Sequence, residues 1–189
     1  TVKSNNGQPI SFIEALKQRF NCSSVDELNS TLQGYTFATD INGENFIRSI
    51  SAIDKVNDHI NFFCDVVSGE KLYLLKRTSL ADTLQKDLRN FSQDKPPAIG
   101  GILNDCILRR LGYPQEIHHI DHFQDLPVAG FSSFGEISGL HVNETLTAIF
   151  FYQVNAGEPF SDAYIDNFAV HYAGCQAFFF TRTIERQKS

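Results

Sequence analysis

The sequence predicts an α+β fold: a mostly antiparallel, twisted sheet with helices packed on it, in a single domain that ends in a connector helix. Two runs rich in aromatic and β-branched residues, 35–41 and 46–53, flank Asn42-Gly43, a strong hairpin signal. Segments with capping signals and helical periodicity precede and follow these runs. The chain has 189 residues, of which 42% are hydrophobic and 17 are Phe, and this is enough for one sizeable core.

The first half of the chain predicts two helices and then four strands. Ser11-Phe-Ile-Glu14 has the spacing of a capping box, and the apolar residues after it recur at helical intervals, which predicts a helix over 11–20. Ser24-Val-Asp-Glu27 repeats the signal and predicts a short second helix. We then expect four consecutive antiparallel strands, at 35–41, 46–53, 60–66 and 72–75.

The second half predicts three more helices and three more strands. Ser79-Leu-Ala-Asp82 opens a helix whose leucines and Phe91 lie about one turn apart on one face. Pro96-Pro97 leads from this helix into the next strand. The expected elements are a strand over 98–106, a helix within 114–123, strands over 127–134 and 143–153, and a final helix from 161 to about 185.

These elements suggest three parts: a linker over 1–10, one folded domain over 11–153, and a C-terminal helix over 161–189. The break at Gly157-Glu-Pro159 separates the last two parts. The helix, about 25 residues long against a mean of about 11 or 12, favours a connector that leads to an output module. Because the chain starts without a signal peptide and stops within this helix, we expect it to be a piece of a longer protein.

Composition argues against several classes of protein. The net charge is −6 and no dense run of Lys and Arg is present, which argues against nucleic-acid binding. Apolar stretches are far shorter than the roughly 20 residues that cross a bilayer, so we expect no membrane span. The four cysteines are scattered without a CxxC pair, which favours reduced thiols in a cytoplasmic protein. Because motifs such as GxSxG and the P-loop are absent, we expect no enzyme.

The most informative segment runs from Gly101 to Tyr152. An apolar strand ends in Cys106-Ile-Leu-Arg109, and Pro127-Val-Ala-Gly-Phe-Ser-Ser-Phe-Gly-Glu-Ile and His141-Val-Asn-Glu-Thr-Leu follow it. In this order and spacing the segment resembles the C-terminal half of the FIST sensory domain, an input module of bacterial signalling proteins. The resemblance extends upstream through the Tyr-x-Phe strand, Phe-Ile-Arg-Ser and Gly-Glu-Lys-Leu-Tyr-Leu-Leu, and covers roughly residues 8–153.

This resemblance implies an intracellular, ligand-binding sensory domain of a bacterial signal-transduction protein, with a role like that of a chemoreceptor in chemotaxis. It implies an amino acid or a derivative as the ligand. It also implies two partners within the same chain: an N-terminal FIST half, and a downstream module such as a methyl-accepting region or a histidine kinase. Some members of the family are reported to bind haem and to respond to nitric oxide, so a haem-based sensor is one alternative. A protein-interaction scaffold without a small ligand is another.

Six residues are the candidate ligand-binding set. Arg109 could fork onto a carboxylate or phosphate beside the Cys106 thiol. The segment around Ser132 and Glu136 joins glycines, which allow close approach, to hydroxyl and carboxylate groups. His141 and Asn143, with Thr145, would share one side of a strand. The complete set is Cys106, Arg109, Ser132, Glu136, His141 and Asn143.

Each candidate also has a structural explanation that leaves ligand binding aside. Cys106 could be a buried small hydrophobe beside a surface Arg109, the glycines could form a β-bulge, and the polar strand could face water. A Cys106–His141–carboxylate relay can be drawn, but its geometry is not in the sequence. The spacing of His118 and His122 suits a metal ligand pair, although a solvated helix face is favoured because no further ligands follow. No cofactor is required; for haem, the axial ligand would be His141 or His171.

A homodimer is the remaining expectation. The final helix carries an aromatic stripe that is larger than a lone surface helix should expose to water. The stripe comprises Tyr164, Phe168, His171, Cys175, Phe178 and Phe179.

Overall fold

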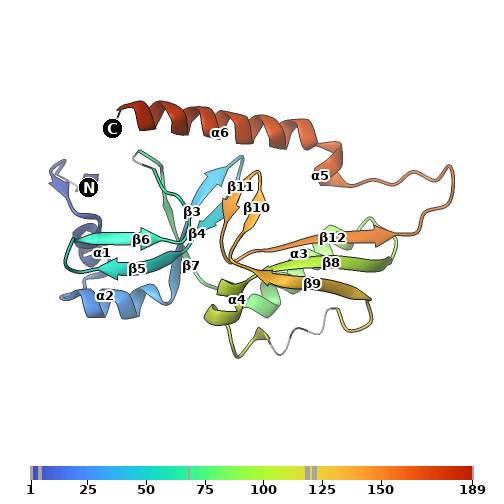
Figure 1. Ribbon diagram of the computed structural model, residues 1–189, viewed down its shortest axis with the longest axis horizontal. Helices are drawn as coiled ribbons and strands as arrows, with labels where there is room; N and C mark the ends of the chain where they lie inside the picture. The colour runs from blue at the N-terminus through green and yellow to red at the C-terminus, as the bar shows by residue number, and fades with distance from the viewer. Residues whose placement is uncertain (1, 4–5, 68, 118–119, 121–122, 189) are drawn as a thin grey trace.

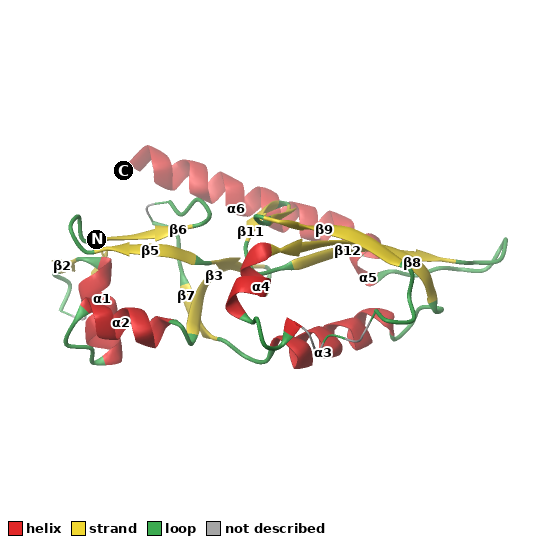
Figure 2. Cartoon of the chain, turned by 60° about the horizontal axis from the view of Figure 1, so that its bottom comes forward, coloured by secondary structure: helices red, strands yellow, loops and turns green. Residues whose placement is uncertain are grey.

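The computed structural model describes residues 2–3, 6–67, 69–117, 120 and 123–188. It has the predicted α+β class, with helices, mostly antiparallel sheets and a long C-terminal helix (Figure 1). Two parts lie side by side along the longest axis of the molecule, and the last helix runs along both of them (Figures 1 and 2). Among the described residues, none of the helices combines the length and the apolar character needed to cross a membrane.

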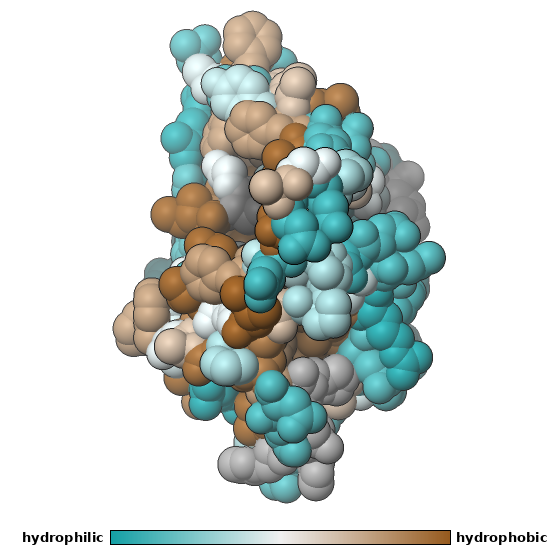
Figure 3. Space-filling view, turned by 90° about the vertical axis from the view of Figure 1, so that its right-hand side faces the viewer, coloured by the Kyte–Doolittle hydropathy of each residue, from teal (hydrophilic) through white to brown (hydrophobic). Residues whose placement is uncertain are grey.

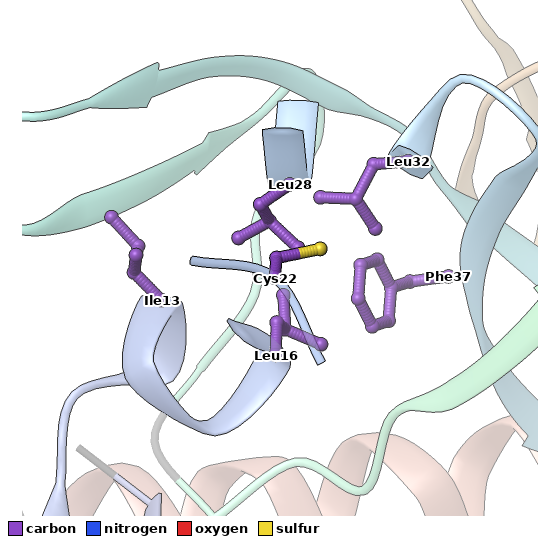
Figure 4. Close-up of a cluster of buried hydrophobic side chains, with 6 residues drawn as sticks. All are labelled: Ile13, Leu16, Cys22, Leu28, Leu32 and Phe37. Carbon is purple, nitrogen blue, oxygen red and sulfur yellow. The ribbon is translucent and has the colours of Figure 1, made fainter. Parts of the chain in front are cut away.

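The first part packs two helices and a hairpin around a three-stranded antiparallel sheet. β3 is the central strand of the sheet, with β4 and β7 on either side. Six side chains form its buried core, Ile13, Leu16, Cys22, Leu28, Leu32 and Phe37 (Figure 4). The elements are β1 (Val2–Lys3), β2 (Pro9–Ile10), α1 (Phe12–Phe20), α2 (Val25–Leu32), β3 (Tyr35–Ile41), β4 (Glu44–Arg48), β5 (Ile50–Asp54), β6 (His59–Phe62) and β7 (Tyr73–Lys76).

Serine caps fix the starts of the three helices for which the sequence predicted them. The hydroxyls of Ser11, Ser24 and Ser79 each accept a hydrogen bond from the backbone amide three residues later, at 3.0, 3.1 and 3.2 Å. Such a bond satisfies one of the amides that a helix leaves unpaired at its N-terminus. The predicted helices at 11–20, after Ser24 and after Ser79 are therefore confirmed, within a residue of their starts.

The expected run of four consecutive antiparallel strands is wrong. The predicted strand 46–53 is two strands, β4 and β5, which separate at Ser49, and β5 pairs with β6 outside the β4-β3-β7 sheet. At the break, the Ser49 amide donates to the Asn143 side chain at 3.3 Å, and its hydroxyl donates to Glu144 at 2.7 Å. Contacts with a segment more than 90 residues away thus redirect the chain here.

The second part is a three-stranded sheet in the order β12-β8-β9, with α3 on one face. β8 is antiparallel to β12 and parallel to β9, and a short hairpin, β10–β11, links the two parts. The elements are α3 (Leu80–Ser92), β8 (Ala98–Cys106), α4 (Ile107–Gly112), β9 (Val128–Ser133), β10 (Glu136–Ser138), β11 (Leu140–Val142) and β12 (Leu146–Tyr152).

The helix expected within 114–123 falls partly outside the described residues. Residues 114–116 form a turn and residue 117 has 3-10 conformation, while residues 118–119 and 121–122, including the proposed histidine pair, lie outside the described residues. The carboxylate of Glu116 in this turn accepts hydrogen bonds from the Ser79 hydroxyl at 3.0 Å and from the Leu80 amide at 2.7 Å. The segment therefore closes the start of α3.

The other face of the β12-β8-β9 sheet is open and apolar. Side chains that share this face through the strand register, and that are exposed, are Ile102, Phe131, Ile149 and Phe151. Seen from this end of the molecule, hydrophobic residues gather on one side and hydrophilic residues on the other (Figure 3). A face of this kind marks a site of interaction more often than a solvated surface.

The final helix is α6 (Phe168–Lys188), preceded by the single turn α5 (Ala163–Asp166). Phe178 and Phe179 pack on a second buried cluster, formed by Ile41, Phe46, Leu140 and Val142. The expected aromatic stripe is thus divided: Tyr164 and Phe168 are exposed, while Phe178 and Phe179 cover the protein's own core. This division means that the stripe as a whole cannot serve as a dimer surface.

Gly130→Ala should destabilise the second part. A Cβ at this position would overlap the carbonyl oxygen of Leu103, its partner in β8, so the parallel strand pair would have to separate. We expect a loss of about 2–3 kcal/mol in the free energy of unfolding, measured by chemical denaturation. Gly34→Ala is the control, because its Cβ would make only ordinary contact at 3.7 Å, and it should change stability by less than about 1 kcal/mol. Equal effects of the two changes would contradict the packing described.

Candidate functional site

A hollow of about 610 Å³ separates α3 from the inner face of the β12-β8-β9 sheet. Its volume is within the roughly 300–1,000 Å³ typical of small-molecule sites. Helix α3 supplies Leu84, the only buried residue of this helix. The other apolar lining residues are Leu103, Ile117, Ile120, Phe123, Val128, Ala129, Phe131 and Leu146.

The polar end of the hollow is built around Asp105, at the end of β8. Its carboxylate accepts a hydrogen bond from the buried Arg109 guanidinium and pairs with Arg110 Nε at 3.3 Å. Ser132, on the neighbouring strand β9, donates from its hydroxyl to the Asp105 carbonyl at 3.1 Å. All four side chains line the hollow, so a carboxylate, two guanidinium groups and a hydroxyl lie at one end of an otherwise apolar space.

Arg109 also reaches a second hollow, of about 380 Å³, on the other side of Leu84 and Leu146. Five N–H donors surround a guanidinium, and the bond to Asp105 uses one of them. Glu144 and Asp87 contribute further carboxylates to this second space. Arg109 is thus a fixed cation between two hollows, and its planar fork matches the geometry of a carboxylate.

Glu136 lies buried beside this polar end. Burial raises the pKa of its carboxyl above the usual value; the Ser133 hydroxyl and the charge of Arg109 lower it, and the negative charge of Asp105 raises it further. The Ser133 hydroxyl donates to one carboxylate oxygen, while the other, Oε2, is buried without a hydrogen-bond partner. A carboxyl group in this position holds a proton more readily than one in water.

A model of the FIST C domain family matches residues 13–139, about two thirds of the chain. This chain belongs to the FIST C domain family. The predicted resemblance is therefore confirmed, and the family is a sensory domain family of signalling proteins. Searches of curated proteins and of solved structures returned no match.

The FIST C domain brings together two of the six predicted site residues in one hollow, Arg109 and Ser132. Glu136 is buried close to Asp105 and Arg109 without lining that space. Cys106 is fully buried, and its backbone amide donates to the Thr145 carbonyl at 3.0 Å. In the interior position described, the Cys106 thiol can act as a packing group next to the site.

His141 and Asn143 have separate environments in this FIST C domain. The expectation that they share one strand face with Thr145 is wrong, because β11 ends at Val142 and Glu144 has a left-handed backbone, with φ 52°. The side chain of Asn143 is fully buried, and the backbone amide of Asn143 donates to the Ile47 carbonyl at 3.2 Å. Asn143 therefore joins the two parts of the domain, whereas His141 is exposed.

His141 lines a third, more apolar hollow of about 430 Å³. Its Nε2 lies close to Gly135, where a Cβ would overlap it. His171 is stacked on Tyr164, with ring centroids 4.5 Å apart. Within the described part of the chain, no three His, Cys, Asp or Glu side chains form a potential metal site.

Sequence reasoning missed two polar residues of the hollow, Asp105 and Arg110. The separation of Asp105 and Arg109 by four residues is the spacing of an ion pair on a helix, and this signal could have identified Asp105. In the structure Asp105 is the last strand residue but one, and α4 begins at Ile107, so the pair bridges the junction from strand to helix. The hollow itself depends on how α3 sits over the sheet, which is a long-range property.

Glu136→Gln should flatten the dependence of stability on pH. Because folding raises the pKa of Glu136, the folded chain keeps a proton that the unfolded chain loses near 4.5. The free energy of unfolding therefore falls as pH rises from that value through the raised pKa. Glutamine is neutral throughout, so the variant should lose this fall and be at least as stable as the unsubstituted chain at neutral pH. Urea denaturation between about pH 4 and pH 8 measures the difference.

Glu116→Gln is the matched control, with the opposite sign. Burial opposes the shift, but hydrogen bonds from the Ala81 amide, the Ser79 hydroxyl and the Leu80 amide outweigh it and hold the pKa of Glu116 below its usual value. Stability from Glu116 is therefore present above its unfolded pKa of about 4.5 and lost as pH falls. This variant should be less stable at neutral pH. If Glu136→Gln kept the original pH profile, the account of its buried carboxyl would fail.

Proposed function

We propose that this FIST C domain is an intracellular, cytoplasmic input domain of a bacterial signal-transduction protein, chemoreceptor-like in its role, and that it binds an amino acid or a derivative in the 610 Å³ hollow. The observation that carries the proposal is the adjacency of opposite charges at the polar end. An amino acid presents a carboxylate and an ammonium on one carbon. Arg109 offers donors to the first and Asp105 an acceptor to the second, while Leu84 and Leu103 line the space for an apolar side chain.

A route from the hollow to α6 supports the sensory role. Asp105 faces Glu136 at the start of the β10–β11 hairpin, and the backbone carbonyl of His141 in β11 accepts a hydrogen bond from Arg48. Arg48 pairs with Glu70 at 3.5 Å, and Glu70 pairs with Arg182 of α6 at 3.4 Å. Ligand binding can shift α6 only by as much as the ligand's affinity differs between two arrangements of these groups.

The proposal includes two partners in the same protein, an N-terminal FIST half and a downstream signalling module reached through α6. The open face formed by Ile102, Phe131, Ile149 and Phe151 is the surface we assign to the N-terminal half. Covering this face would remove four large apolar side chains from water, and because Phe131 of the edge strand β9 also lines the hollow, the N-terminal half would border the hollow along β9. Support for both partners comes from the family resemblance.

The ligand proposal predicts stabilisation that depends on Arg109. In a thermal-shift screen of the 20 amino acids, at least one should raise the melting temperature in a dose-dependent way; at 100 times the dissociation constant the gain is about 2.7 kcal/mol. Arg109→Lys should reduce or abolish the shift, because lysine cannot make the bidentate contact. Screening is best done with the N-terminal FIST half present as well as on this chain.

Arg77→Lys is the matched control for Arg109→Lys. Arg77 also pairs with a carboxylate, Glu144, at 2.6 Å, but it lines neither the 610 Å³ hollow nor the 380 Å³ hollow. This variant should lose stability and keep the ligand-induced shift. A shift that survives in Arg109→Lys, or that disappears equally in both variants, would place the ligand elsewhere. A domain that serves only as a scaffold would show no shift with any amino acid.

The route to α6 predicts that Glu70→Gln loosens the helix. The side chains of Glu70 and Arg48 are 2% and 1% exposed, and breaking a buried pair costs about 3–5 kcal/mol because a charge stays unpaired. Amide hydrogen exchange in the second half of α6 should accelerate by at least about tenfold. Asp65→Asn is the control, because Asp65 pairs with Arg182 and Arg186 at the surface and should matter much less. Unchanged amide hydrogen exchange in α6 of Glu70→Gln would contradict the proposed route.

A further inference from the structure

Helix α6 is attached to the rest of the molecule by one face only. Gly174 lies directly against Asn42, and Cys175 lies against Gly139. Below these contacts, α6 continues with three further inward-facing residues, Phe178, Phe179 and Arg182. The rest of the chain lies on one side of the helix, as Figure 1 shows.

The opposite face of α6 carries a second apolar row, here called the outer seam. It consists of Val170, Ala173, Ala177, Phe180 and Ile184, all exposed. The exposed fractions of the three large members are 63% for Val170, 69% for Phe180 and 36% for Ile184. Successive helical residues are about 100° apart, so Phe180 points away from Phe178 and Arg182. The seam is therefore distinct from the docked face.

The spacing of the outer seam identifies the kind of partner. Its members follow one another at intervals of three, four, three and four residues. This is the heptad a/d pattern, in which each apolar side chain inserts between four residues of a facing helix. Ala173 and Ala177 are small and allow close approach of another backbone. A single surface helix without a partner would not be expected to expose such a row to water.

The lack of charge beside the seam suits a second copy of this chain as that partner. Five of the residues that flank the seam at the e and g positions are uncharged. They are Ala169, Gly174, Gln176, Thr181 and Thr183. The remaining flank, Lys188, pairs with Glu185 of its own helix at 2.7 Å. Two identical helices can therefore meet along the seam without like charges facing each other, whereas a charged partner helix would find no complementary flank.

We propose that the outer seam of α6 binds the outer seam of a second copy, forming a two-helix coiled coil at the centre of a homodimer. Both protomer bodies then lie on the far sides of the paired helices, because each body is attached to the face opposite the seam. This inference does not depend on ligand binding in the hollow, and its failure would leave that proposal intact. Two-fold dimers are also the commonest closed assembly of identical chains.

A charge placed in the seam tests the proposal. Phe180→Glu would bring unpaired carboxylates into the helix interface and should raise the dimer dissociation constant by at least about a hundredfold in analytical ultracentrifugation. Phe168→Glu is the matched control: the same change, on the same helix, at a residue that is 55% exposed but lies off the seam. It should leave the dimer essentially unchanged. Because both phenylalanines are exposed in the protomer, circular dichroism should show the same folded helix in each variant.

Cysteine cross-linking provides an independent readout. Ala177→Cys lies near the centre of the seam and should form a disulfide-linked dimer in the full chain under mild oxidation, whereas Phe168→Cys should not. Ala173→Cys should cross-link only when the two helices are parallel, so it reports their orientation. The proposal is overturned if the unsubstituted chain sediments as a monomer throughout a concentration series. It is equally overturned if Phe168→Glu dissociates the dimer as fully as Phe180→Glu, because association would then be a general property of exposed apolar residues.

Discussion

The buried guanidinium of Arg48 is the constraint on which the arrangement of the chain depends. Its side chain is almost completely excluded from water, and a charge in that position is tolerated only when partners surround it. Two partners come from distant segments: the His141 carbonyl in β11 and the Glu70 carboxylate. Glu70 in turn holds Arg182. One cation at the end of β4 thus ties the first sheet, the connecting hairpin and the C-terminal helix together.

The two parts of the molecule differ in how their layers are held. In the first part, Leu28 and Phe37 are among the buried side chains that fill the space between helices and sheet. In the second part, Leu84 is the only buried residue of α3, and Glu116 holds the start of this helix through hydrogen bonds. A layer anchored mainly at one end and backed by hollows can adjust to an occupant at lower cost than a close-packed core. The less closely packed layer between α3 and the second sheet is therefore where a sensory domain would be expected to bind its ligand.

Local signals in the sequence predicted the elements that local interactions determine. Serine caps at Ser11 and Ser79 and the long apolar strand at 98–106 appear where expected, because each depends on neighbouring residues. The break at Ser49 and the burial of Asn143 depend on each other across 94 residues, and no short-range pattern contains that information. The same limit applies to the site. The sequence identified Arg109 and Ser132, which line the same hollow, but it did not show that His141 would line a different hollow.

The two faces of α6 make the helix suited to carry a signal. Its docked face is held by side-chain contacts and by the partly buried Arg182–Glu70 pair, so a small movement of the β10–β11 hairpin changes the energy of that attachment through Arg48. Its outer seam needs a rigid, in-register partner to be buried. A coiled coil resists bending and transmits rotation or sliding along its axis. In a single exposed helix, thermal bending would mask a displacement of this kind. Pairing of the outer seams would therefore convert a local change at Glu70 into a change in the relative position of the two paired helices. The free energy available for that change is limited by the difference in the ligand's affinity for the two arrangements.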